Sequence, residues 1–141
     1  MLIGLNSLLT PDLLHALASM GHGDTIALVD ANYPATRGRL VRLPGANIAA
    51  ALRAVLSVVP LDRSVATPAQ VMLPAGDVVP PAVAEMNGVL SEHGAAPATG
   101  LARHEFYAAA ERAYAVVATG ERRPYGNILL TKGVVPPDAA P

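Results

Sequence analysis

Side chains that could move a proton or hold a hydroxyl group occur at three separated places in the chain, and the first is His22. It stands in Met20-Gly21-His22-Gly23-Asp24, which the flanking glycines predict to be a turn between a helix and a strand. The pKa of a free histidine, about 6.5, suits proton transfer near neutrality, so His22 is the leading candidate for an acid or base. The alternative is a histidine that only caps the turn, and the motif by itself leaves both interpretations open.

Asp30 is the second candidate. It follows directly on Thr25-Ile26-Ala27-Leu28-Val29, a short apolar run typical of a strand buried on both faces. A carboxylate that emerges from the core at a strand end must find partners there, and open α/β sheets bind ligands at the carboxyl ends of their strands. The structural alternative is that Asp30 only caps the following turn.

The third place is the polar segment from Thr119 to Gly126, which leads into the apolar run 127–131. Tyr125 and Asn127, on either side of Gly126, supply a phenol and an amide. These neutral donors and acceptors suit the hydroxyl groups of a sugar. The alternative is that Pro124-Tyr125-Gly126-Asn127 is only a turn that joins two strands.

Motifs for metal or nucleotide chemistry do not occur. Arg103-His104-Glu105 resembles the start of a zinc-protease helix, but Ala108 stands where the second histidine would be. The chain has no cysteine, so a thiolate zinc site is excluded, and neither a Walker loop nor G-x-G-x-x-G occurs. We therefore expect neither a metal nor a cofactor.

The composition predicts one compact domain. The chain has 141 residues, of which 52% are apolar and 15% charged, and its net charge of −1 gives no basic surface for nucleic acid. It has no basic leader segment and no apolar run of the roughly 20 residues that a membrane helix needs, so we expect a cytoplasmic protein without a membrane anchor. High apolar content in so short a chain favours association with copies of itself.

Helices and strands are expected to alternate along the chain. Thr10-Pro11-Asp12 predicts a helix start, with Gly21 ending that helix in the left-handed conformation, and Asn47 predicts the cap of a second helix. Residues 32–45 read as turns. The remaining expectations are strands over 25–29, 70–73, 114–118 and 127–131 and helices after Pro80-Pro81 and over 104–112.

This alternation indicates one α/β domain with a mostly parallel or mixed sheet. We expect the domain to span residues 1–135. The proline-rich residues 136–141 cannot continue a helix or strand and are expected to form a flexible tail.

Taken together and in order, these segments resemble the ribose pyranase and L-fucose mutarotase family. The resemblance runs over nearly the whole chain, from Leu8-Leu9-Thr10-Pro11-Asp12 through Met-Gly-His-Gly-Asp and Asp-Ala-Asn-Tyr-Pro to the motif over 120–134. It implies a three-layer α/β/α sandwich around a mixed, mostly parallel sheet. It also implies ring-like homo-oligomers, commonly decamers of stacked pentamers, with active sites near subunit interfaces.

The resemblance also implies roles for individual residues. The family's general acid corresponds to His22, and its sugar-binding positions to Asp30, Tyr125, Gly126, Asn127 and Arg103. An arginine at position 103 is similar to the fucose-type members, whereas ribose-type members have histidine there. His104 is one residue away, so the choice between Arg103 and His104 stays open.

The activity implied is that of an isomerase that interconverts the anomers of a free monosaccharide without a cofactor. L-fucose is the sugar that the resemblance favours. Asn32-Tyr33 stands where fucose-type members often have His-Phe, so the identity of the sugar stays open. The alternatives are a D-ribose pyranase, a non-catalytic monosaccharide-binding accessory to sugar transport, and a purely structural oligomeric scaffold.

Overall fold

The computed structural model describes residues 1–139, which form four helices and six strands. In chain order the elements are α1 (Pro11–Ser19), β1 (Thr25–Val29), β2 (Leu40–Leu43), α2 (Ile48–Leu56), β3 (Ala69–Met72), α3 (Pro81–Glu92), β4 (Thr99–Leu101), α4 (Arg103–Glu111), β5 (Ala115–Thr119) and β6 (Ile128–Thr131).

All six strands belong to one sheet with the order β2-β5-β1-β6-β3-β4. Strand β6 runs antiparallel to its neighbours β1 and β3, and the other pairings are parallel. Five strands therefore point one way and β6 points the other, so the expectation of a mixed, mostly parallel sheet is confirmed.

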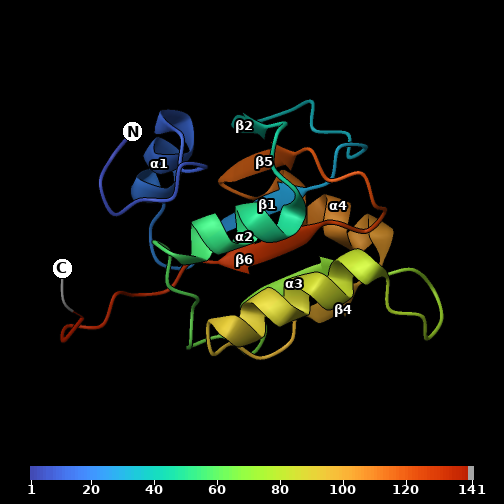
Figure 1. The fold of residues 1–141 in the computed structure, drawn as a ribbon. Helices are drawn as coiled ribbons and strands as arrows, with labels where there is room; N and C mark the ends of the chain where they lie inside the picture. The colour runs from blue at the N-terminus through green and yellow to red at the C-terminus, as the bar shows by residue number, and fades with distance from the viewer. Residues whose placement is uncertain (140–141) are drawn as a thin grey trace.

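The sheet is covered on both faces, because successive side chains of its strands point to opposite sides. In β1, Ile26 and Leu28 pack among side chains of α1, α2 and α3. Ala27 and Val29 point the other way and pack against Phe106 of α4. Figure 1 shows α2 and α3 on one face of the sheet and α4 on the other. The expected three-layer α/β/α arrangement is therefore confirmed.

The two sheet ends are chemically different places. Strands β1 to β5 all finish at one end, which we call the carboxyl edge; β6 begins there, with Leu28 paired to Ile128. At the opposite end, the amino edge, β1 begins and β6 finishes, with Thr25 paired to Thr131. The loops that follow β1, β3, β4 and β5 consequently gather at the carboxyl edge.

Two predicted helix caps are confirmed. Thr10 accepts a hydrogen bond from the Leu13 N–H through its hydroxyl, and Asn47 accepts one from the Ala50 N–H at 2.8 Å. These caps satisfy amide groups that have no partner inside the helix.

The expectation of a left-handed Gly21 was wrong. Helix α1 ends at Ser19, and Met20 is already extended, with φ −65° and ψ 138°, so no glycine is needed to leave the helix. The left-handed residue is Gly23, with φ +86°, and its N–H donates to the carbonyl of Lys132. The glycine that the turn requires is thus the one that leads into β1.

Strands β2 and β4 were missed because their neighbours in the sheet define them. Strand β2 lies within the stretch predicted to be turns, and it is held by parallel pairing to β5. Strand β4 has three residues, one of them Gly100, and pairs with β3. Both lie at the edges of the sheet, where strands are often short.

Past the sheet, residues 136–139 contain neither helix nor strand, and Ala139 donates from its N–H to the carbonyl of Pro136. The last two positions of the expected tail, 140 and 141, lie outside the described residues. No helix within residues 1–139 has the length and apolar character to cross a membrane.

Candidate functional site

Asp30 lies at the carboxyl edge and is held there by Asn127. The Asp30 N–H donates to Asn127 Oδ1 at 3.0 Å, and Asn127 Nδ2 donates back to Asp30 Oδ2 at 2.9 Å. The other carboxylate oxygen, Oδ1, accepts from the Asn32 N–H at 2.9 Å. Both side chains are buried, with residue exposures of 6% for Asp30 and 3% for Asn127. A carboxylate offers about four lone pairs, so Asp30 is fixed in place and can still accept from a hydroxyl group.

The loop between β5 and β6 is organised by Glu121. Its buried carboxylate accepts hydrogen bonds from the Arg123 guanidinium at 2.9 and 3.0 Å and from the Arg123 N–H at 2.8 Å. The Ile48 N–H, at the start of α2, also donates to it. The Arg123 hydrogen bonds, above all those of the guanidinium, lower the pKa of Glu121 to about 2. Glu121 therefore remains ionised and ties the loop to the N-terminus of α2.

A tight turn inside this loop directs Tyr125. Its φ of +63° lies in the left-handed region, which residues other than glycine rarely adopt. At the next position, an added Cβ on Gly126 would lie 2.7 Å from Glu121 Cγ and 3.4 Å from Asp30 Cβ. A side chain at this position would force the loop away from Asp30, so glycine keeps the residue next to Tyr125 close to Asp30.

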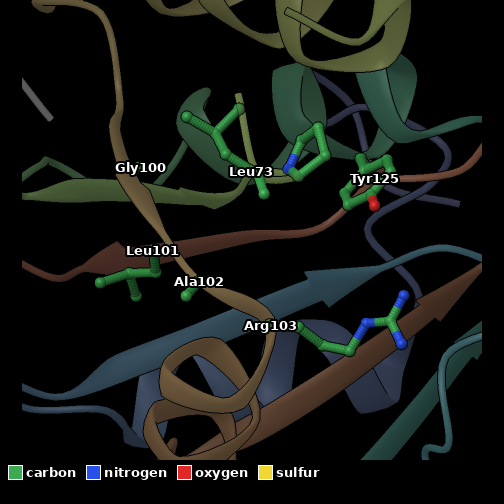
Figure 2. A pocket seen from close by; sticks show the side chains of 8 residues that line it. Leu73, Gly100, Leu101, Ala102, Arg103 and Tyr125 are labelled. Carbon is green, nitrogen blue, oxygen red and sulfur yellow. The ribbon is translucent and has the colours of Figure 1, made fainter. Parts of the chain in front are cut away.

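Tyr125 and Arg103 line a pocket of about 430 Å³ at the carboxyl edge. This volume falls in the range of roughly 300 to 1,000 Å³ that is usual for small-molecule sites. Figure 2 shows the Tyr125 hydroxyl and the Arg103 guanidinium at the same end of the pocket. The rest of the lining comes from the ends of β3 and β4 and the residues that follow them: Leu73, Pro74, Ala75, Gly100, Leu101 and Ala102.

The structure distinguishes Arg103 from His104, which the sequence left open. Arg103 is the first residue of α4 and lines the pocket. His104 does not line it, and its ring lies edge-on to Tyr107 with 6.4 Å between the ring centroids. Of the two residues, Arg103 is therefore the one that shares the pocket with Tyr125.

His22 lies at the other end of the sheet. It precedes β1, whereas Asp30 follows it, so the five residues of β1 separate them. At about 3.3 Å per residue, the strand alone spans roughly 16 Å. A single chain therefore brings Asp30, Tyr125, Gly126, Asn127 and Arg103 to one edge and leaves His22 at the other.

At the amino edge His22 has a partner of its own. Its Nε2 lies 3.1 Å from Asp62 Oδ2, and the His22 side chain is 53% exposed while that of Asp62 is 5% exposed. Asp62 is brought there by its N–H, which donates to the carbonyl of Thr131 at the end of β6. His22 is thus a partly exposed imidazole oriented by a buried carboxylate.

Sequence reasoning gave no role to Asp62, Glu121 or Arg123. Glu121 and Arg123 stood inside the recognised loop motif, and a charged pair next to a candidate tyrosine could have drawn attention to them. Asp62 carries no such signal, since it is 40 positions from His22 and contacts it only through the fold. Within residues 1–139, no three His, Asp or Glu side chains are grouped as a metal site would require.

The protein has a three-layer α/β fold with a mostly parallel sheet and a pocket at the carboxyl edge, the end of such a sheet where ligands usually bind. Residues 3–135 match the profile of the RbsD / FucU transport protein family. The chain belongs to this family.

Relatives and solved structures support this assignment. The chain is 43% identical over 144 residues to fucose mutarotase of Bos taurus, covering 95% of this chain and 94% of that one. It is similar to the crystal structure of fucose mutarotase from Streptococcus pneumoniae in complex with L-fucose, with a TM-score of 0.90, 41% identity and coverage of 96% and 100%. Bacillus subtilis RbsD complexed with D-ribose shares the fold, with a TM-score of 0.77, 22% identity and coverage of 96% and 99%.

Proposed function

We propose that the protein is a mutarotase that interconverts the α and β anomers of L-fucose by opening and reclosing the sugar ring. The observation that carries this proposal is the pocket at the carboxyl edge, which Tyr125 and Arg103 line. Asp30 and Asn127 are hydrogen-bonded to each other at the same edge. Relatives at 41 to 43% identity are named fucose mutarotase, and one of them binds L-fucose in its crystal structure.

The pocket suits a neutral sugar. Asp30 accepts from sugar hydroxyls, and Tyr125 and Arg103 donate to them, so a ring with several hydroxyl groups is bound through both kinds of hydrogen bond. Asn127 acts mainly by holding Asp30, because both atoms of its amide are already bonded to that residue. Gly126 contributes its small size, which allows the loop to approach Asp30.

Ring opening needs a proton at the ring oxygen while the anomeric hydroxyl loses its own. In the proposal His22 donates that proton, and the open aldehyde rotates and recloses as the other anomer. Holding the sugar in one place beside the acid provides the rest of the acceleration.

This mechanism requires more than one copy of the chain, because His22 and the pocket lie at opposite edges of the sheet. We propose that the amino edge of one copy covers the carboxyl edge of the next and brings its His22 to the pocket. Such a head-to-tail contact closes into a ring when the rotation between copies permits, in keeping with the expected ring-like oligomer.

Exposed apolar side chains near both edges support this contact. At the carboxyl edge Val78 and Val79 are 75% and 56% exposed, in the segment that follows the pocket residues Leu73, Pro74 and Ala75. Around the amino edge the chain exposes Val65, Val134 and Val135, which flank Asp62 and the end of β6. Large exposed apolar groups are typical of surfaces that become buried on association.

The experiment that tests the function is NMR saturation transfer between the anomers of L-fucose, D-ribose and D-galactose, with and without the protein. We expect accelerated exchange for L-fucose, and no acceleration for any sugar would refute the mutarotase assignment. The His22→Ala variant should lose the acceleration and keep the fold, and His15→Ala, a change of the same kind in an exposed helical residue, is the matched control.

The same experiment separates the alternatives. Acceleration for D-ribose alone would make the protein a ribose pyranase. Saturable binding of a sugar without acceleration would identify an accessory to sugar transport, a role that the name of the family allows. The presence of Arg103 on the pocket favours the fucose activity, since that residue is the feature shared with fucose-type members. We also propose that the protein acts in the cytoplasm, as expected from the sequence.

A further inference from the structure

His22 and Asp62 form a pair at the amino edge whose geometry restricts the chemistry of the imidazole. His22 Nε2 lies 3.1 Å from Asp62 Oδ2. The other oxygen of Asp62, Oδ1, accepts from the Ser64 N–H at 2.8 Å and from the Ser64 hydroxyl at 2.7 Å. Each Asp62 oxygen therefore has its own partner, His22 for Oδ2 and Ser64 for Oδ1.

The state of Asp62 decides which ring nitrogen carries a hydrogen. The hydrogen bonds from Ser64, together with His22, hold the pKa of Asp62 below its usual range. An ionised carboxylate only accepts hydrogen bonds, so the nitrogen facing it must be an N–H. In the neutral imidazole the remaining lone pair is then on Nδ1.

The backbone of the His22 turn is held independently of this pair. The Gly21 N–H donates to Asp24 Oδ2 at 2.7 Å, and the Gly23 N–H donates to the carbonyl of Lys132 at 2.9 Å. Lys132 Nζ donates to the carbonyls of Leu17 and Met20 at the end of α1. With both flanks fixed, the imidazole has its Nε2 side turned to Asp62 and is otherwise half exposed.

We propose that Asp62 is a positioning residue that fixes His22 in the Nε2–H tautomer, so that Nδ1 is the atom that exchanges a proton with the sugar. This inference rests on the proposed mutarotase function and deepens it.

The proton balance follows from this assignment. The species that donates is the imidazolium of His22, in which both ring nitrogens carry a hydrogen. In ring opening the bond between the anomeric carbon and the ring oxygen breaks, and its electron pair goes to the ring oxygen. That oxygen takes the proton from Nδ1, which leaves His22 as the neutral Nε2–H tautomer. The anomeric hydroxyl gives its proton to a water molecule, and its electron pair forms the carbonyl. Reclosure runs the same steps backwards and returns the proton to Nδ1. The hydrogen on Nε2 remains there throughout and is donated to the carboxylate of Asp62.

The substitution Asp62→Asn gives an unusually sharp test. Ser64 donates two hydrogen bonds to the Oδ1 position, so the amide oxygen of the asparagine must occupy that position. The amide NH₂ then faces His22 Nε2 and donates to it. His22 is forced into the opposite tautomer, with the hydrogen on Nδ1, while size and shape are unchanged.

The measurement is ¹⁵N solid-state NMR of the full chain labelled with ¹⁵N-histidine, near pH 8.5, where an ordinary histidine with a pKa of about 6.5 is neutral. This method does not depend on the size of the assembly. The chain has four histidines, and the His22→Gln variant identifies the His22 signals. We expect wild-type Nε2 to be protonated and Nδ1 to be bare, and Asp62→Asn to reverse the two signals.

Anomeric exchange of L-fucose is measured on the same samples. We expect Asp62→Asn to lower the exchange rate by about 10² to 10⁴-fold, the usual contribution of an acid or base. The control is Asp138→Asn, the same change at an exposed position beyond the sheet, which should keep both the wild-type tautomer and the wild-type rate.

Wild-type protein with the hydrogen on Nδ1 would overturn the inference, whether or not the variant folds. A reversed tautomer in Asp62→Asn with an unchanged exchange rate would overturn the assignment of the proton to Nδ1. Wild-type protein that accelerates exchange of no sugar would refute the proposed function instead, and the tautomer result, obtained without sugar, would stand apart from it.

Discussion

Asp30 and Asn127 hold each other through two hydrogen bonds of opposite direction, 3.0 Å from the Asp30 N–H to Asn127 Oδ1 and 2.9 Å from Asn127 Nδ2 to Asp30 Oδ2. The two residues are 97 positions apart, and the pairing of β1 with β6 brings them together. One amide thus fixes both the backbone and the carboxylate of Asp30 at the carboxyl edge.

Replacing Asn127 by aspartate should expose the importance of this pair. Asn127→Asp puts two buried carboxylates in contact and removes the donor to Asp30 Oδ2. We expect a loss of about 2 to 3 kcal/mol in the free energy of unfolding at pH 7, measured by urea unfolding. The loss should shrink near pH 5, because one shared proton relieves the repulsion. Asn6→Asp, at an exposed position, is the control; an equal loss there would show that the effect is not due to the pair.

Gly126 should not accept even one added carbon. In Gly126→Ala the new Cβ would meet Glu121 Cγ at 2.7 Å, so the loop must shift away from Asp30. We expect a cost of about 1 to 3 kcal/mol in thermal unfolding and weaker sugar binding. The matched control is Gly88→Ala in α3, where nothing lies within 4 Å of the new Cβ. That change should stabilise the helix by roughly 0.5 to 1 kcal/mol. Stabilisation by both changes would contradict the close packing at Gly126.

Acid should weaken the loop that carries Tyr125. The folded pKa of Glu121 is about 2, below its value of 4.5 in an unfolded chain, so the unfolded state binds the proton more readily. The stabilisation by the Arg123 hydrogen bonds is complete above pH 4.5 and is lost as the pH falls toward 2. Glu121→Gln should cost on the order of 2 kcal/mol at pH 7 and much less at pH 2.5, measured by unfolding at both pH values. Glu111→Gln, at an exposed site, should show no such pH-dependent difference.

Mixing two inactive variants should restore activity if the active site is shared between copies. His22→Ala keeps an intact pocket, and Asp30→Asn keeps an intact His22. When the two are unfolded together and reassembled at equal amounts, about one quarter of the sites should combine a normal pocket with a normal His22 from the neighbour. The measurement is anomeric exchange of L-fucose. A mixture as inactive as its components would mean that His22 does not serve a neighbouring pocket.

The sequence predicted those parts of the fold that depend on local signals. The caps Thr10 and Asn47 act within three residues, and the apolar run of β1 shows its burial directly. Strand β4 shows the limit, because Thr99-Gly100-Leu101 has no strand pattern and becomes a strand only beside β3. Gly21 and Gly23 are equally good candidates for a left-handed residue by type. The hydrogen bond from the Gly23 N–H to the carbonyl of Lys132, the residue after β6, is a tertiary contact that the sequence does not show.

For the candidate site, the sequence indicated which residues lie at each end of β1 but not the partners that hold them. The positions of Asp30 and His22 at the two ends of one strand were visible in the sequence, since the run between them is short and apolar. The partners Asp62 and Glu121 were not, because their contacts arise from strand order and loop packing. Charge alone does not reveal which acidic residues will be buried.

Because the five residues of β1 separate His22 from the pocket, a single defective gene could affect more sites than its own copies carry. Consider a ring in which each pocket is completed by His22 of the neighbouring copy. A copy that lacks both His22 and Asp30, the residues at the two ends of this strand, inactivates two sites: its own and the neighbouring site that its His22 would complete. In a cell with one normal and one such gene, random assembly would leave about one quarter of the sites active instead of one half. A defective allele would then be more dominant than gene dosage alone predicts.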